Sequence, residues 1–148
     1  MARSIFYKCT KKQIEDATNK ILNILKSGQK DSLREETKDA EEREKNKKFK
    51  ADYDINDEYK KELLIDNLKK EKIFDVKLDE RPEKLRNGNE MYIYYLVLDL
   101  LVDNREIKVD TYVKIEMLQI KGNKKIVLLI SFHKPDYAMY ERFSELKD

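Results

Sequence analysis

The sequence is poor in residues that break or cross-link a chain. Its 148 residues include one cysteine, two prolines, three glycines and no tryptophan. Cys9 has no second cysteine to pair with, so an internal disulfide is excluded and a reducing compartment such as the cytoplasm is favoured. No apolar run approaches the roughly 20 residues that cross a bilayer, and the N-terminus lacks the apolar region of a signal peptide. We therefore expect a cytoplasmic protein without a membrane span.

The signatures of several enzyme classes are also missing. There is no glycine-rich phosphate loop and no G-x-S-x-G motif. His133 is the only histidine, which leaves no second one for a zinc site or for a nucleophile pair with Cys9. Thirty acidic residues leave a carboxylate metal site open, but no compact acidic motif points to one. We expect neither a metal nor a cofactor.

Charged residues are abundant, at 42% of the chain, yet the net charge is only +2. This excludes a uniformly polybasic nucleic-acid binder. The basic residues are in excess in residues 1–30 and 105–134, and phosphate contacts need only such a local excess. The length fits one domain spanning residues 1–148.

Residues 107–120 alternate between apolar and polar side chains, the period-two pattern of a half-buried strand. Gly122 and Asn123 accept the backbone angles of a hairpin loop, so the apolar residues that follow are predicted to form the next strand. A two-residue loop, or a four-residue loop closed by Ile120 and Lys125, places Tyr112 directly opposite His133.

A third strand is predicted over residues 91–102, a nearly continuous apolar run rich in aromatic and β-branched residues. The length also permits a buried helix, but its tyrosines and the Asp103-Asn104 turn favour a strand. That turn would place Tyr95 opposite Tyr112. The three strands form an antiparallel meander with the 107–120 strand in the centre.

Helices are predicted before the meander. Thr10 and Gln13 can form a capping box for an amphipathic helix that ends at Gly28. Another helix is capped by Asp54 or Asn56 and ends near residue 70.

Three further stretches are less patterned. Residues 31–50 carry mixed charge and are predicted to be an exposed helix or partly disordered, either a solvated face or a set of partner contacts. Residues 71–89 are interpreted as a connection with Ile73, Phe74 and Val76 packed inward, and residues 138–148 as a short C-terminal tail.

The fold class that follows is α+β, with two or three helices packed on one face of a three-stranded antiparallel sheet. The other, solvent-accessible face would carry a row formed by Tyr95, Tyr112 and His133, with Lys114 and Ser131 beside it. A polar surface patch is the ordinary interpretation of such a row. The alternative is RNA cleavage without a metal, because histidine titrates near neutral pH, tyrosine can position a nucleophile or donate a proton, and lysine supplies positive charge.

The order of a basic first helix, the segment KNKKFKADYDINDEYKKELLIDNLKKEKIFDV, the strand TYVKI and the terminal strand VLLISFHKPDY resembles the MqsR family of bacterial toxins. The resemblance covers about residues 10–137. It implies a RelE-like fold and a ribosome-independent endoribonuclease that cuts single-stranded messenger RNA and is silenced by a cognate antitoxin protein.

The resemblance also implies roles for individual residues. Tyr112 stands at the family's catalytic tyrosine, in Y-[LV]-K-I, and His133 at the basic residue that follows V-[IV]-S-F. The family has a further lysine after its third helix, and Lys77 lies two residues beyond the position that corresponds to it. The family also has a glutamine in a strand near the start of the sheet, which has no clear counterpart in residues 91–95. The predicted catalytic residues are Tyr112, His133, Lys114 and Lys77, and the predicted RNA-binding residues are Tyr95, Lys108, Lys124, Lys125 and Lys134.

Two alternatives to a ribonuclease remain open at this point. One is a non-catalytic interaction protein, such as an inhibitor or antitoxin-like protein of a phage or mobile element, that binds another protein through its charged helices and sheet face. The other is RNA binding without cleavage.

Overall fold

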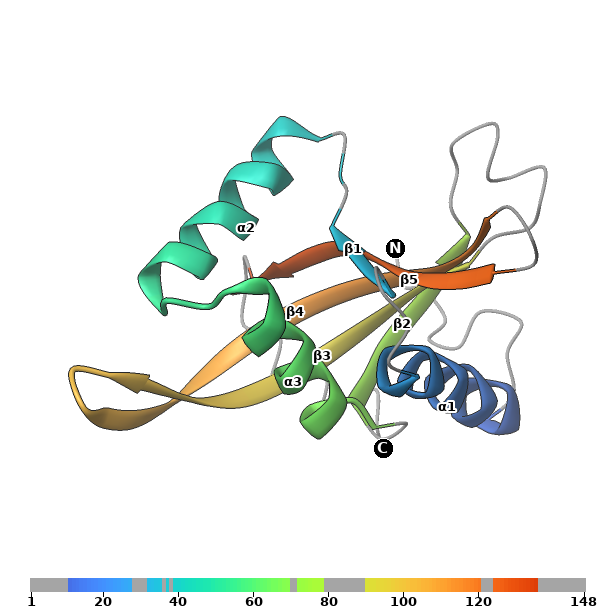
Figure 1. The fold of residues 1–148 in the computed structure, drawn as a ribbon, viewed down its shortest axis with the longest axis horizontal. Coiled ribbons are helices and arrows are strands. Elements are labelled where there is room, and N and C mark those ends of the chain that lie inside the picture. Colours follow the sequence, from blue (N-terminus) through green and yellow to red (C-terminus); the bar gives the residue numbers. More distant parts are fainter. Residues whose placement is uncertain are drawn as a thin grey trace.

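The computed structural model describes residues 11–27, 32–35, 37, 39–69, 72–78, 90–120 and 124–135. In this part of the chain, three helices and one five-stranded sheet form an α+β fold (Figure 1), which confirms the predicted class. The elements in chain order are α1 (Lys11–Lys26), β1 (Leu33–Glu35), α2 (Ala40–Asp52), α3 (Asp57–Asn67), β2 (Ile73–Leu78), β3 (Glu90–Val102), β4 (Arg105–Ile120) and β5 (Lys124–His133). The predicted caps at Thr10 and Gly28 and the predicted tail at residues 138–148 lie outside the described residues.

The sheet has the strand order β1-β5-β4-β3-β2. Its centre is the predicted antiparallel meander β3-β4-β5, but a sheet of only three strands was wrong. β2 pairs antiparallel with β3 in a stretch predicted to be a connection. β1 pairs in parallel with β5 and lies in the stretch predicted to be charged helix. Three residues are too few to show the alternation of polar and apolar side chains that marks a strand, so β1 can be identified only from its pairing with β5.

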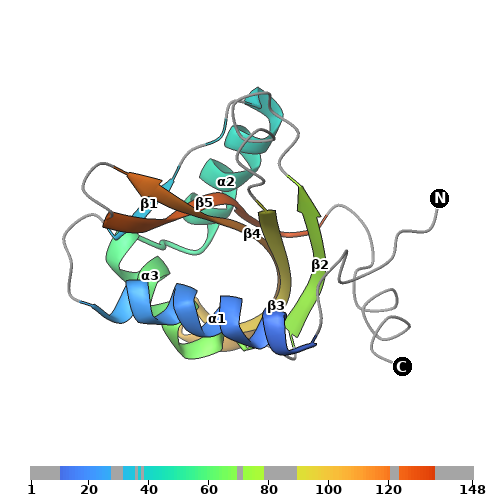
Figure 2. The ribbon, with the colours of Figure 1, turned by 90° about the vertical axis from the view of Figure 1, so that its right-hand side faces the viewer.

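The predicted first and last helices are present. α1 buries Ile14, Ile21 and Leu25, and Figure 2 shows it on the concave side of the curled sheet. α3 begins at the predicted cap Asn56, whose side chain accepts a hydrogen bond from the Tyr59 N–H at 2.7 Å. The main core joins these helices to the concave face of the sheet, through residues that include Leu64, Tyr94, Leu96, Leu98, Val113, Ile115, Val127, Leu129 and Phe132.

The turn between β3 and β4 is the predicted one. Asp103 and Asn104 have φ values of 52° and 66°, in the left-handed region that these two residue types tolerate better than most. The ladder that starts from this turn pairs Tyr95 with Tyr112, which confirms the expected register.

The β4-β5 register agrees with the prediction at one end only. Tyr112 is paired with His133, as expected, but Ile120 is paired with Lys124 where the predicted register placed Lys125. A β-bulge at Ile130 absorbs the difference of one residue, because no residue of β4 lies opposite it. The bulge lets β5 turn Val127 and Leu129 into the main core while His133 lies on the other face. The loop of residues 121–123 is outside the described part.

The second face of the sheet is not the open surface that was expected. Ile93 and Tyr95 of β3 are only 1% and 4% exposed, and Ile126 and Leu128 of β5 are buried on the same face. The prediction of a solvent-accessible face was therefore wrong over this part of the sheet. A sheet buried on both faces no longer shows a clean alternation of polar and apolar residues.

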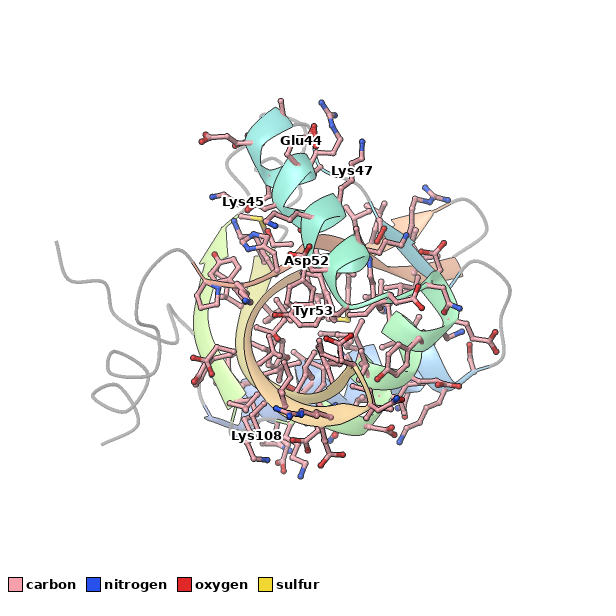
Figure 3. The ribbon with its side chains drawn as sticks, turned by 90° about the vertical axis from the view of Figure 1, so that its left-hand side faces the viewer. Glu44, Lys45, Lys47, Asp52, Tyr53 and Lys108 are labelled. Atoms are coloured by element: carbon pink, nitrogen blue, oxygen red, sulfur yellow. The ribbon has the colours of Figure 1, made fainter. Side chains whose placement is uncertain are left out.

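The predicted helix in the charged stretch of residues 31–50 is confirmed only from Ala40 onward, where α2 begins. Its cap is Asp39, whose carboxylate accepts the N–H groups of Glu41 and Glu42 at 2.9 and 3.3 Å. The helix lies against β5. Figure 3 shows Lys45 and Lys47 pointing to opposite sides of it, so these two lysines do not share one surface.

Asn46 of α2 takes the place of a neighbouring strand at the edge of β5. Its amide nitrogen donates to the Ile130 carbonyl at 3.0 Å, and its amide oxygen accepts the Phe132 N–H at 2.9 Å. β1 pairs with β5 only at residues 127–129, so Asn46 satisfies main-chain groups just beyond that pairing. The side chain thereby fixes α2 beside the bulge.

Replacing Asn46 with alanine should lower the free energy of unfolding by about 1–3 kcal/mol, because the substitution leaves a carbonyl and an N–H without these partners. Urea denaturation followed by circular dichroism measures the change. Lys47→Ala, at the exposed next position of the helix, is the control and should change the value by less than about 0.5 kcal/mol. Equal effects of the two substitutions would contradict this role of Asn46.

Candidate functional site

Four residues form a two-by-two patch on the second face of the sheet, where β5 ends. Tyr112 is paired with His133, and Lys114 is paired with Ser131. Two residues along a strand return to the same face, so all four belong to one side of the sheet. The bulge at Ile130 lies directly before Ser131 on β5 and so borders this patch. The structure therefore places together the predicted catalytic residues Tyr112, His133 and Lys114.

His133 is held at both nitrogens of its ring. Nε2 lies 2.7 and 3.1 Å from the two carboxylate oxygens of Glu42, in the first turn of α2. Nδ1 lies 2.6 Å from the main-chain carbonyl of Lys134. Both partners are acceptors, and only the protonated imidazolium carries an N–H on each nitrogen. The geometry thus corresponds to a positively charged His133 paired with a negatively charged Glu42.

The electrostatics of Glu42 agree with this ion pair. Its pKa is lowered below the ordinary value, first by the hydrogen bond from His133 and further by the positive charges of His133 and Lys114, although burial acts in the opposite direction. The carboxylate therefore stays ionised throughout the neutral range.

Tyr112 packs flat against this charged ring. The ring centroids of Tyr112 and His133 are 5.6 Å apart, and the planes differ by 19°. The Lys114 ammonium lies 5.9 Å from the centroid of the Tyr112 ring. Two cations thus flank one half-buried tyrosine.

His133 itself is 4% exposed. The expectation that it would lie open to solvent beside Tyr112 was wrong, because the first turn of α2 lies over its outer nitrogen. Tyr112 and Lys114 are both partly accessible. In this structure they are the members of the patch that a ligand from solvent would meet.

Tyr95 is not available as a stacking surface for a base. It is 4% exposed, and its hydroxyl donates to the Asp110 carboxylate at 2.9 Å. Its expected position opposite Tyr112 is confirmed, but its burial is that of a core residue.

Of the predicted RNA-binding lysines, Lys108 and Lys134 border one groove, whereas Lys124 and Lys125 lie at the start of β5. Lys108 is exposed on the β3-β4 hairpin (Figure 3), where its ammonium lies 2.9 Å from Asp99. Lys134 is exposed near the end of α2, with its ammonium 5.5 Å from the centre of the Tyr53 ring. A hydrogen bond with the Tyr53 hydroxyl raises the pKa of Lys134. Both lysines border a groove of about 440 Å³ that Tyr53 also lines.

The remaining predicted residues lie elsewhere. Lys125 is exposed near the start of β5, eight residues and about 27 Å along the strand from His133. Lys124 begins the same strand. Lys77 in β2 is paired with Met91, in the row that contains Glu116, about 13 Å along β4 from Tyr112. The side chains of Lys77 and Lys124 are outside the described part of the structure.

Glu42 is the residue that the sequence analysis missed. It lies in a stretch dominated by charge, where one glutamate is not distinguishable from its neighbours. With Asn46 and Phe49 it forms an i, i+4, i+7 row, and all three residues contact β5. This row was the available signal, because Phe49 is the one large apolar residue of the helix.

In the described residues, no helix is long and apolar enough to cross a membrane, and no cluster of three or more His, Cys, Asp or Glu residues could hold a metal ion. No family model, curated protein or solved structure matches the chain.

Proposed function

We propose that the protein is an endoribonuclease that cleaves single-stranded RNA, with its reaction centre at Tyr112, Lys114 and His133. One observation carries this proposal: a partly accessible tyrosine packs against a histidine held in its charged form, with a lysine on the same face. Phosphoryl chemistry needs a group that exchanges protons beside fixed positive charge, and this patch supplies both.

The proposed reaction is an internal transfer within the RNA. The 2′-oxygen attacks the adjacent phosphorus, a new O2′–P bond forms and the bond from phosphorus to the 5′-oxygen breaks. Tyr112 gives its phenolic proton to the departing 5′-oxygen and receives the proton that leaves the 2′-hydroxyl. The products are a 2′,3′-cyclic phosphate and a 5′-hydroxyl, and no water is consumed.

The two cations have a different role in this scheme. Negative charge grows on the phosphate oxygens as the 2′-oxygen attacks, and positive charge already in place stabilises it without reorganisation. Lys114 supplies one charge and the imidazolium of His133 the other.

The resemblance of the TYVKI and LLISFHKPDY segments to MqsR toxins supports the same proposal. On that basis the cellular substrate is messenger RNA, the regulator is a cognate antitoxin protein and the compartment is the cytoplasm. A small gene for an antitoxin next to this one in the genome would support this assignment.

The Tyr112→Phe variant should lose about 10²- to 10⁴-fold in the rate of RNA cleavage, because it keeps the ring on His133 but removes the proton donor. The measurement follows a labelled single-stranded RNA on denaturing gels, with EDTA present throughout. A 2′-deoxy nucleotide at the cleaved position should block the reaction.

Tyr59→Phe, at a partly buried tyrosine of α3, is the matched control for this experiment. It should leave the cleavage rate unchanged. A Tyr112→Phe variant that cleaves at the wild-type rate would contradict the assignment of Tyr112. A wild-type protein that cleaves RNA only when EDTA is left out would contradict a metal-independent reaction.

One observation favours the second candidate, a non-catalytic interaction protein. The β3-β4 hairpin extends beyond the rest of the sheet (Figure 1), and near its end Leu101 is 68% exposed and Ile107 37% exposed. The two side chains lie on opposite faces of the hairpin, so a protein partner that contacts both would enclose the end of the hairpin. RNA that stays intact with the wild-type protein would favour this function.

A further inference from the structure

The carboxylate of Glu42 is surrounded by groups that bind anions. His133 donates to it from Nε2 at 2.7 Å, and Lys114 acts on it through its positive charge. Ser131, paired with Lys114 and next to His133 on the same face of β5, directs a hydroxyl toward the same carboxylate. The three groups come from adjacent positions on two paired strands, so the sheet itself fixes their spacing.

The Glu42 carboxylate does not provide a hydrogen-bond acceptor for every donor around it, because it leaves the Ser131 hydroxyl without one. The Ser131 side chain is fully buried and its hydroxyl has no hydrogen-bond partner. It lies close enough to the Glu42 carboxylate to lower the pKa of that group, but the two groups do not form a hydrogen bond of good geometry. A buried hydroxyl without a hydrogen-bond partner destabilises the folded state. Such a group next to two cations indicates a ligand with more acceptor oxygens than a carboxylate offers.

We propose that His133, Lys114 and Ser131 form the binding site for a phosphate group of the RNA, and that Glu42 is an internal competitor which occupies this site until the substrate displaces it. The inference rests on the proposed function, because the phosphate it names is that of the reacting RNA. A phosphodiester carries one negative charge, as a carboxylate does, but has four oxygens around phosphorus where a carboxylate has two, so it can replace Glu42 at the same donors and also reach the Ser131 hydroxyl.

Displacement requires little movement of the protein. The Glu42 side chain is already 18% exposed and stands in the first turn of α2, so a change of rotamer takes it into water. The helix remains attached through the two hydrogen bonds of Asn46 and the edge-to-face contact of Phe49 with Phe132, whose ring centroids are 5.5 Å apart. His133 then offers Nε2 to the substrate while Lys134 continues to hold Nδ1.

Two roles of Glu42 predict opposite results. If Glu42 only orients His133 and keeps it charged, its removal weakens anion binding and slows cleavage. If Glu42 competes with the phosphate, its removal strengthens both. Glu42→Gln separates the two, because glutamine keeps the size of the side chain and removes the charge.

The experiment titrates inorganic phosphate into the folded protein and follows the imidazole signals by NMR, which are unambiguous because the chain has a single histidine. Glu42→Gln should bind phosphate about tenfold more tightly than the wild type, as expected when a charged competitor worth about 1.4 kcal/mol is removed. Adding Ser131→Ala to Glu42→Gln should reverse most of this gain. Glu44→Gln makes the same change of charge at an exposed position of α2 and should have no effect.

Phosphate affinity in Glu42→Gln equal to or below that of the wild type would overturn the proposal. Glu42→Asp is the second variant in case glutamine disturbs folding: it keeps the charge but is one methylene shorter, and it too should bind phosphate more tightly. The titration needs no RNA cleavage, so the two proposals fail separately. Tighter phosphate binding without any cleavage retains the anion site and rejects the ribonuclease, whereas cleavage without tighter binding rejects the competitor.

Discussion

The His133→Asn variant should lose about 10²- to 10³-fold in the rate of RNA cleavage, the usual contribution of a preorganised group that stabilises the charge developing in the transition state. The substitution removes the imidazolium against which Tyr112 packs and with it one of the two positive charges of the patch. Initial rates on the labelled RNA at several pH values measure the loss. The pH profile of kcat/KM should also lose one of its limbs, which a purely structural effect would not cause.

His133→Lys tests whether positive charge is what His133 supplies to the reaction. Lysine keeps a positive charge at the position but does not titrate near neutral pH, so the variant should keep part of the activity with a changed pH profile. Thermal melting of each variant establishes that it is folded. A folded His133→Asn protein that cleaves RNA at the wild-type rate would contradict a role for His133 in the reaction.

The Phe132→Ala variant should be the most strongly destabilised, by about 3–5 kcal/mol, because it removes a fully buried ring from the junction of α2, α3 and β5. The Phe132 ring makes an edge-to-face contact with Phe49, and the ammonium of the buried Lys60 lies 5.4 Å from its centroid. In a chain of this length the loss corresponds to a fall in Tm on the order of 10 °C. Calorimetry or urea denaturation would measure it.

Leu101→Ala is the control for this measurement, because Leu101 is the most exposed large apolar residue of the described part of the chain. It should change stability by no more than about 0.5 kcal/mol. A double-mutant cycle with Phe49→Ala should give a coupling of about 0.5–1.5 kcal/mol for the aromatic pair. A loss below about 1 kcal/mol for Phe132→Ala would contradict the packing described above.

Local pattern was sufficient for the elements whose partners are near in sequence. The alternation in residues 107–120 and the Asp103-Asn104 turn predicted β4 and its register with β3. The apolar stripe that includes Ile14 and Ile21 predicted α1, and the cap at Asn56 predicted α3. These signals are local because a strand repeats every two residues, a helix about every 3.6, and turn or cap residues are chosen by their own backbone angles.

Contacts between distant parts of the chain decided the rest of the fold. β1 and β2 were missed because short strands are identified by what they pair with. Residues 126–130 are apolar without interruption, so alternation could not show where β5 changes face. The bulge at Ile130 is set by what β5 packs against on each side, with Val127 and Leu129 in the main core and Ser131 on the opposite face.

In the candidate site, too, one part could be predicted from local sequence and another part depends on tertiary contacts. The sequence by itself determined that Tyr112 lies opposite His133, because turn residues and a period of two fix the pairing of neighbouring strands. Only the tertiary structure decided that His133 is buried and charged, since this depends on a glutamate 91 residues away along the chain. Nothing local distinguishes Glu42 from the other acids of its helix. Its role arises when Asn46 and Phe49 dock α2 on β5 and bring one carboxylate to the imidazole ring.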